Sequence, residues 1–439
     1  MKKTMIALLI MTSVHVAAQE KWTMQQCMQY AVAHNHEVKR AELELDNYKA
    51  AKTSAIGRFL PAVDAGIGAQ YNFGRAIDPE TNGYTDVSTF YNDYSLHTSL
   101  PVFDGFSRLH VLKAAKAGEL MGRAALRKQQ DQIALSTLQA YTNAVYYEGL
   151  VKMAEEKVEE TELLLKQIHL LEEVGRKSAA DVAQVESQKA EADYELTRQL
   201  NLFSLAMLEL RKEMGVSLSS SEADTIVLAP MEFIDSTDRV IEAPSGIVGG
   251  PSVDVAHYQV QVSKHEWRQA RAALLPALSL SAGLNTTYFH TLHSSVGQSF
   301  RSQFKNNMGE YVGATLSIPL FNRLQTVSNI RKAKNNYRMA CESFEQTRLE
   351  LEKLAWEAWH DWQAYQKQTE QMKHKVEADS LAYQLTRRQF EEGLSTAIDL
   401  RTTSAQLLHS KATLLQCQLM TIVKEQLIRY YRGETIWTE

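Results

Sequence analysis

The side chains of this chain that could perform chemistry are scattered along the sequence. His34 and His36 are separated by one residue, and on a helix that spacing directs the two imidazoles to different faces, so a shared metal ion is not expected. Cys27, Cys341 and Cys417 lack the CxxC spacing of a metal site and do not form a disulfide framework. The sequence has no glycine-rich phosphate loop and no nucleophile elbow. We therefore expect no enzyme, no metal site and no cofactor.

Polar and apolar residues alternate in two segments, 62–74 and 278–289. This period of two is that of a strand with two different faces. Strands of roughly 9–11 residues span a membrane, and segments 90–102 and 308–320, which alternate less regularly, are the expected partners. A soluble sheet with one buried face is the alternative. On the membrane interpretation, the polar set faces a water-filled lumen and comprises Asp64, Gln70, Asn72, Ser279, Ser281 and Asn285.

The second half of the chain repeats the first at an offset of 218 residues, so that Pro101 corresponds to Pro319 and Gly175 to Gly393. Stretches without proline are rich in helix-forming residues and predict long helices. The helix predicted at about 178–214 is roughly half as long as the one before it. We expect the N-terminal helix, about 22–56, to continue it end to end. The four proline-free stretches are 22–56, 107–214, 252–273 and 323–439.

Each long helical stretch is interrupted once, by a glycine that is followed by a hydroxyl residue. A glycine ends a helix in the left-handed conformation, and a serine or threonine caps the next helix. Each interruption therefore predicts the tip of a helical hairpin. Asp181 and Asp399 fall in the first turn of the returning helices, where the helix dipole favours an acidic residue.

The N-terminus has the form of a secretory signal peptide, predicted to comprise residues 1–18. Lys2 and Lys3 precede a short apolar run, and small residues precede the expected cleavage point. No cysteine lies at that point, so we do not expect a lipid anchor. The formal net charge is −5 and there is no basic stripe along the chain, which argues against nucleic acid as a partner.

Four strands cannot close a barrel, and open strand edges are not tolerated in lipid. Two chains would give eight strands and three chains twelve. Small barrels of about eight strands are filled by side chains, so the polar set favours a wider, hollow oligomer. We expect the mature chain to be divided into a first structural repeat at 19–216, a linker at 217–250, a second repeat at 251–433 and a tail at 434–439.

Together these features resemble the TolC family of outer-membrane efflux proteins. The resemblance rests on the two tip motifs, on the Leu-Pro start of each first strand, and on the Pro-Val-Phe-Asp-Gly and Pro-Leu-Phe-Asn-Arg ends of each second strand. It implies a mainly α-helical homotrimer, with a helical barrel in the periplasm and a shared 12-stranded barrel in the outer-membrane lipid. It also implies that the tips dock a periplasmic adaptor, which connects to an inner-membrane pump of the RND or ABC class. The implied docking residues are Gly175, Arg176, Ser178, Gly393, Leu394, Ser395 and Thr396.

By the same resemblance, acidic residues just past the second tip narrow the pore entrance. Asp399 matches the first acidic position, and three copies near one axis would raise the pKa of the carboxylate through mutual repulsion. Thr402 occupies the second position, so a second acidic ring is absent. Asp181 is the corresponding residue of the first tip. A role of Asp181 and Asp399 in the helix ends alone remains the alternative.

The function that this resemblance implies is passive conduction through an outer-membrane channel of a tripartite efflux or type I secretion system. Two alternatives remain. An adaptor-like periplasmic protein would have one hairpin flanked by β-rich domains, and a structural coiled-coil envelope protein would lack strands inserted at equivalent places in both halves. The polar set does not specify the cargo.

Overall fold

A computed structural model describes residues 21–77, 83–86, 88–217, 226–231, 241–244, 249–292 and 298–438. The predicted signal peptide and much of the predicted linker lie outside these residues. The chain divides into two compact units, and each contains pieces of both sequence repeats. Unit 1 comprises residues 1–42, 126–251 and 348–439, and unit 2 comprises residues 43–125 and 252–347.

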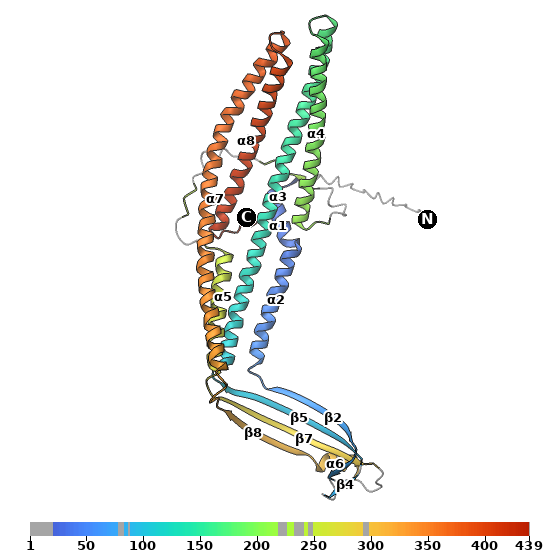
Figure 1. Ribbon diagram of the computed structural model, residues 1–439, viewed down its shortest axis with the longest axis vertical. Coiled ribbons are helices and arrows are strands. Elements are labelled where there is room, and N and C mark those ends of the chain that lie inside the picture. Colours follow the sequence, from blue (N-terminus) through green and yellow to red (C-terminus); the bar gives the residue numbers. More distant parts are fainter. Residues whose placement is uncertain are drawn as a thin grey trace, which may run out of the picture. The chain divides into compact units, whose positions relative to one another are not determined.

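The helices reproduce the internal repeat (Figure 1). Two 67-residue helices, α3 and α7, begin 218 residues apart, and so do α4 and α8, which follow them. The 22-residue helices α2 and α5 begin 215 residues apart. Within the described residues, none of these helices combines the length and apolar character that a membrane-spanning helix needs. Their bounds are α1 (Met24–His34), α2 (His36–Gly57), α3 (Ser107–Glu173), α4 (Ala179–Met214), α5 (Pro251–Ala272), α7 (Gln325–Glu391) and α8 (Ala397–Tyr431).

The single helix predicted at 22–56 is in fact two helices, because Asn35 has an extended conformation with φ −62° and ψ 136°. Its side chain joins two other helices of unit 1. The Oδ1 atom accepts a hydrogen bond from the backbone N–H of Glu37, in the first turn of α2, at 2.8 Å. The Nδ2 atom donates to the carbonyl oxygen of Glu213, in the last turn of α4, also at 2.8 Å. The helix that continues α4 end to end is therefore α2 alone, and not one helix spanning 22–56 as predicted.

The second repeat has a matching junction. Gly215, which ends α4 with φ +74°, lies against the backbone of Asn35. Its counterpart Gly433, with φ +82°, lies against the backbone of Gly249 and Gly250, just before α5. The left-handed conformation at both glycines directs the chain sharply out of the helix.

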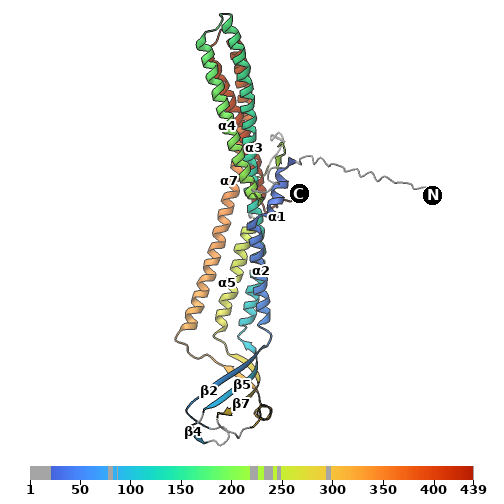
Figure 2. The ribbon, with the colours of Figure 1, turned by 90° about the vertical axis from the view of Figure 1, so that its right-hand side faces the viewer.

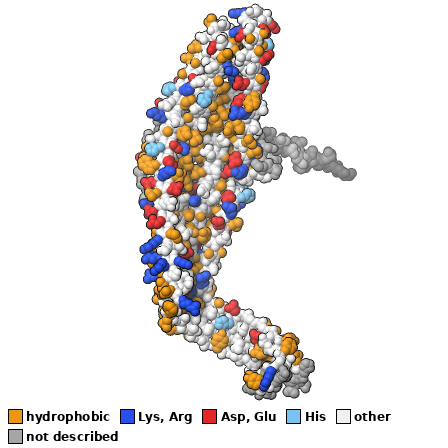
Figure 3. All heavy atoms as spheres, in the orientation of Figure 1, with side chains coloured by type: hydrophobic (Ala, Val, Ile, Leu, Met, Phe, Trp, Pro, Cys, Tyr) orange, Lys and Arg blue, Asp and Glu red, His pale blue; other side chains and the backbone are white. Residues whose placement is uncertain are grey.

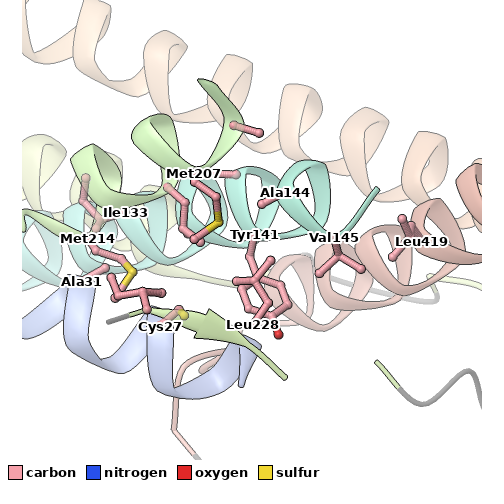
Figure 4. Close-up of a cluster of buried hydrophobic side chains, with 14 of the residues drawn as sticks. Cys27, Ala31, Ile133, Tyr141, Ala144, Val145, Met207, Met214, Leu228 and Leu419 are labelled. Carbon is pink, nitrogen blue, oxygen red and sulfur yellow. The ribbon is translucent and has the colours of Figure 1, made fainter. Parts of the chain in front are cut away.

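The main core of unit 1 surrounds Tyr141 of α3 (Figure 4). Its ring is 1% exposed, and its hydroxyl group lies 3.1 Å from the carbonyl oxygens of both Trp22 and Ala229. These residues belong to or adjoin a short parallel pair of strands, β1 (Lys21–Trp22) and β6 (Val227–Leu228). The pair therefore closes the core over α1, α3 and α4.

Unit 2 contains a four-stranded antiparallel sheet in the order β2-β5-β7-β8, which Figure 1 shows side by side. Figure 2 shows β2, β5 and β7 of this sheet from another side. The four strands predicted from alternation are confirmed, with small differences at their ends. Two further short strands and one short helix, α6, have no sequence prediction, because their segments are too short to show a period. The bounds are β2 (Ala62–Asn72), β3 (Arg75–Ile77), β4 (Tyr84–Asp86), β5 (Thr89–Asp104), β7 (Ala277–Thr291), α6 (Phe300–Asn306) and β8 (Gly309–Ser317).

The chain leaves the second strand of each repeat through two consecutive left-handed residues. Gly105 and Phe106 have φ +65° and +68°, and Arg323 and Leu324, at the 218-residue offset, have φ +57° and +63°. Bulky residues rarely adopt this conformation, so the surrounding structure must hold them there. The repeat therefore extends to backbone geometry that residue types alone would not predict.

Candidate functional site

The strand register of unit 2 places all six predicted lumen residues on one face of the sheet. Asp64 of β2 lies opposite His97 of β5, which lies opposite Gly283 of β7. Directly opposed residues point to the same side, and the side alternates along each strand. The even positions of β2 therefore share one face with the odd positions of β7. These are the residues Asp64, Gln70, Asn72, Ser279, Ser281 and Asn285.

His97 and Tyr311 belong to the same polar face. The imidazole Nδ1 of His97 lies 2.7 Å from the hydroxyl oxygen of Tyr311, across the intervening strand β7. The bond is possible because Gly283 lies between them, where a Cβ atom would come within 2.6 Å of the Tyr311 ring. Alternation at the odd positions of 90–102 could have revealed His97. The contact with Tyr311 depends on register.

The opposite face of the sheet is apolar and uncovered over most of its area in a single chain. Val63, Ile67 and Val312 are 65%, 77% and 87% exposed. Helix α6 covers one end of this face, where Phe304 packs edge-on against the Tyr94 ring. Isolated soluble proteins rarely leave so much contiguous apolar surface in water, so this face requires an apolar partner.

Both hairpin tips have the same hydrogen-bonded helix ending. At the first tip, Gly175 has φ +75° and the N–H of Arg176 donates to the carbonyl of Leu171 at 2.8 Å. At the second, Gly393 has φ +80° and the N–H of Leu394 donates to Gln389 at 2.7 Å. This six-residue ring is the Schellman motif, in which a left-handed glycine satisfies the last helical carbonyls.

The two predicted entrance aspartates are engaged in helix capping within a single chain. Thr396 caps α8, since its Oγ1 accepts from the N–H of Asp399 at 3.2 Å, and the Asp399 carboxylate accepts from the N–H of Thr396 at 3.0 Å. Ser178 and Asp181 form the same reciprocal pair at the start of α4. Hydrogen bonds from Thr396 hold the pKa of Asp399 below its ordinary value, and those from Ser178 do the same for the pKa of Asp181. Repulsion among three copies of Asp399 would act against this local effect.

The two tips pack against each other through residues that the sequence did not single out. The ammonium group of Lys177 lies 4.1 Å from the centre of the Phe390 ring, which is 1% exposed. Gln188 donates through Nε2 to the carbonyl of Ala397 at 3.2 Å. Lys177 therefore takes part in packing, whereas Arg176, next to it in the chain, is exposed.

Thr402 lies apart from the capping groups. Its hydroxyl donates to the carbonyl of Ile398 at 2.9 Å, and its side chain lines a cavity of about 770 Å³ among α3, α4 and α8. Lys157 also lines the cavity, and its ammonium group donates to the hydroxyl of Ser404 at 2.6 Å. Thr402 and Lys157 thus line the same cavity, whereas Asp399 does not line it. Among the described residues, no cluster of three or more His, Cys, Asp or Glu side chains could hold a metal ion.

Comparison with known proteins agrees with this architecture. The family described as outer membrane efflux protein matches residues 27–216 and 248–431, one range in each sequence repeat. The chain belongs to this family. The family prediction made from the tip motifs and strand ends is therefore confirmed.

This outer membrane efflux protein has curated relatives in Pseudomonas putida. It is 22% identical over 426 residues to the probable efflux pump outer membrane protein TtgC of strain KT2440, covering 93% of this chain and 84% of the relative. It has the same identity and coverage with the antibiotic efflux pump outer membrane protein ArpC. The family places the protein in the outer membrane and leaves the adaptor-like and coiled-coil alternatives without support.

Solved structures share the fold. CusC superposes with a TM-score of 0.81 at 16% identity, covering 94% of this chain and 92% of that chain. VceC of Vibrio cholerae gives 0.80 at 15% identity, covering 94% and 96%. The predicted fold class, long helical hairpins with a β-barrel part, is confirmed at this level.

Proposed function

We propose that three copies of this outer membrane efflux protein form one passive channel, with a shared 12-stranded barrel in the membrane. One observation carries the proposal: a four-stranded sheet with one polar face, one apolar face and two unpaired edges. In the order β2-β5-β7-β8, the edges are β2 and β8. Unpaired edges are not tolerated in lipid, so each edge needs a strand from another copy.

Strand direction supports closure by identical copies. Each neighbouring pair in the sheet is antiparallel, so β2 and β8 run in opposite directions. Strand β8 of one copy can therefore pair antiparallel with β2 of the next, and repetition of this contact closes a ring. Three copies give twelve strands and a wider lumen than eight strands would allow.

The polar face would line the lumen. Of its predicted residues, Asp64 carries a carboxylate, and the others are uncharged: Gln70, Asn72, Ser279, Ser281 and Asn285. The apolar face would contact lipid, which would cover Val63, Ile67 and Val312. Such a lumen suits water and small solutes and does not select one particular cargo.

We also propose that the tips dock a periplasmic adaptor and thereby join a pump of the RND or ABC class. The exposed residues at the tips, Arg176 and Leu394 among them, are available for this contact. The remaining predicted docking residues, Gly175, Ser178, Gly393, Ser395 and Thr396, shape and cap the two turns. The efflux-pump names of the Pseudomonas relatives support efflux over type I secretion.

The channel proposal is tested with full-length protein purified in detergent. We expect a trimer by light scattering and discrete conductance steps in planar lipid bilayers. The edge contact is tested with Val312→Pro, which disrupts donation from edge strand β8 and should prevent trimer formation. The control Leu320→Pro, at a 92% exposed residue beyond the end of β8, should leave the trimer intact. A monomer that conducts, or a Val312→Pro variant that remains fully trimeric, would contradict shared closure.

The docking proposal is tested by Leu394→Asp, which places a charge on a side chain that is 76% exposed at the second tip. We expect adaptor binding to weaken by at least about tenfold, as for an exposed apolar contact residue that becomes desolvated on binding. Exposed Leu163, which lies within α3 away from the turn, gives the control Leu163→Asp. Equal binding by wild type and Leu394→Asp would remove Leu394 from the docking surface.

A further inference from the structure

The ends of the helices next to the sheet in unit 2 are strongly basic, although the whole chain is acidic. Residues 49–58, 104–116, 264–275 and 323–338 contain fourteen Lys and Arg and only two carboxylates, Asp104 and Glu266. Asp104 is paired with Arg108 at 3.0 Å, and Lys49 and Lys52 are paired with Asp46 and Glu119 just outside these ranges, so the basic residues of α5 and α7 carry the excess charge. Figure 3 shows Lys and Arg side chains gathered over this part of the helices.

A groove lies within this basic region, between the start of α3 and the end of α5. Its volume is about 450 Å³, within the range of about 300–1,000 Å³ of small-ligand sites. Arg268 and Arg271 provide positive charge on one side. The groove is lined by these two arginines together with Phe106, His110, Leu274 and Leu275.

The arginines lack acidic partners. Among the described residues, no carboxylate oxygen lies within 4.0 Å of Arg268, Arg271 or nearby Lys113. Arg271 instead lies 5.7 Å from the centre of the Trp267 ring. Burial and the charges of Arg268 and Lys113 lower the pKa of His110, so the imidazole adds no charge near neutral pH. Both arginines are exposed and therefore open to an anionic ligand, and the arginine fork matches phosphate.

The other side of the groove is apolar and continues the apolar face of the sheet. The rings of Phe106 and Phe103 meet edge to face with centres 5.3 Å apart. Phe103 lies opposite Leu278, which belongs to the apolar face. The left-handed conformation of Phe106 leaves its side chain 57% exposed beside Leu274, which is 55% exposed.

The groove is also away from the edges where copies would meet. Helix α3 follows β5 and α5 precedes β7, and these are the two central strands of the sheet. A neighbouring copy that pairs with β2 or β8 therefore does not extend a strand across the groove. In the first repeat, the positions equivalent to Arg268 and Arg271 are Thr53 and Ile56, so only the second repeat has this arginine pair.

We propose that this groove binds one anionic phospholipid from the membrane leaflet at the helical end of the strands. Arg268 and Arg271 hold the phosphodiester, and Phe106, Leu274 and Leu275 contact the upper acyl chain. Basic residues beside a membrane attract anionic lipid, and here the adjoining apolar surface adds a specific place for the chain. The proposal rests on the membrane position of the sheet.

The test measures lipid binding to full-length protein in detergent by native mass spectrometry. We expect dioleoyl phosphatidylglycerol to bind more tightly than dioleoyl phosphatidylcholine. Arg268→Gln/Arg271→Gln should weaken phosphatidylglycerol binding by about tenfold or more, as loss of charge-assisted hydrogen bonds implies. Arg331→Gln/Lys332→Gln removes the same charge from α7 outside the groove and should change binding by less than about threefold. Equal weakening by both pairs, or no preference for phosphatidylglycerol, would overturn the proposal.

Four further measurements separate lipid from phosphate and loss of binding from loss of folding. Glycerophosphoglycerol, which has the headgroup without acyl chains, should fail to compete at equal concentration, and equal competition would contradict a lipid site. Phe106→Asn keeps a residue that tolerates the left-handed conformation and should weaken lipid binding. Arg268→Lys/Arg271→Lys keeps the charge at the end of α5 and should bind better than the glutamine pair. Planar-bilayer conductance of the same samples reports channel function separately, so loss of lipid preference in a conducting protein refutes this inference alone.

Discussion

The junction between α4 and α2 gives the most direct test of how this fold is held together. Asn35 is 8% exposed and makes two hydrogen bonds of 2.8 Å, one to each helix. Asn35→Asp keeps the oxygen that caps α2, since Asp and Asn cap helices equally well. It removes the amide donor and places a carboxylate oxygen against the carbonyl of Glu213. We expect the junction to lose about 1–3 kcal/mol of local stability, the cost of leaving a buried acceptor unpaired.

Hydrogen exchange measured by mass spectrometry reads this loss directly, because a free-energy change of about 1.4 kcal/mol corresponds to a tenfold change in local opening. Amides at 36–39 and 213–217 should exchange about 5- to 140-fold faster in Asn35→Asp than in wild type. Asn35→Ala also removes the cap and should lose about 1 kcal/mol more. The matching junction near Gly433 and Gly250 is the internal control and should be unchanged. If the amides at 213–217 exchange in Asn35→Asp at the same rate as in wild type, the role of the amide donor is refuted. Faster exchange at both junctions would indicate general destabilisation.

Three further predictions concern acid sensitivity, the strand exit and the entrance. Hydrogen bonds from its lysine and arginine partners lower the pKa of Glu119 from 4.5 to about 2, so the stabilisation is complete above that ordinary value and is lost as pH falls toward 2. The melting temperature of wild type should therefore be higher than that of Glu119→Gln at pH 6. A difference in melting temperature that is equally large at pH 2 would contradict this. Gly105→Ala forces a side chain into a left-handed position 2.6 Å from a carbonyl oxygen of α5, and should lower stability by about 2 kcal/mol in thermal unfolding, whereas Gly57→Ala, with open space around it, should not. Asp399→Asn keeps a capping oxygen but removes the charge, and should reduce cation selectivity in reversal-potential measurements more than Asp181→Asn; equal effects would remove the second tip as the special entrance.

Local chemistry was enough to determine much of this protein from its sequence. Helix endings depend on residues a few positions apart, so Gly175 and Gly393 marked both tips, and the aspartates three residues after each cap marked the returning helices. Alternation has a period of two regardless of context, so the strands and their two faces could also be predicted. The 218-residue offset then predicted the same elements in the second half as in the first. The structure agrees, since α3 and α7 are equal in length.

Only the tertiary structure decided which distant residues meet. Asn35 breaks a helix that composition favours, because its side chain bonds to Glu213, 178 residues away. Lys177 lies between two predicted docking residues, Arg176 and Ser178, yet it packs on Phe390 of the other hairpin. The groove at Arg268 and Arg271 exists because the ends of α3 and α5 are brought together by paired strands. Such contacts are decided by packing and register between segments far apart in the chain, and no local pattern encodes them.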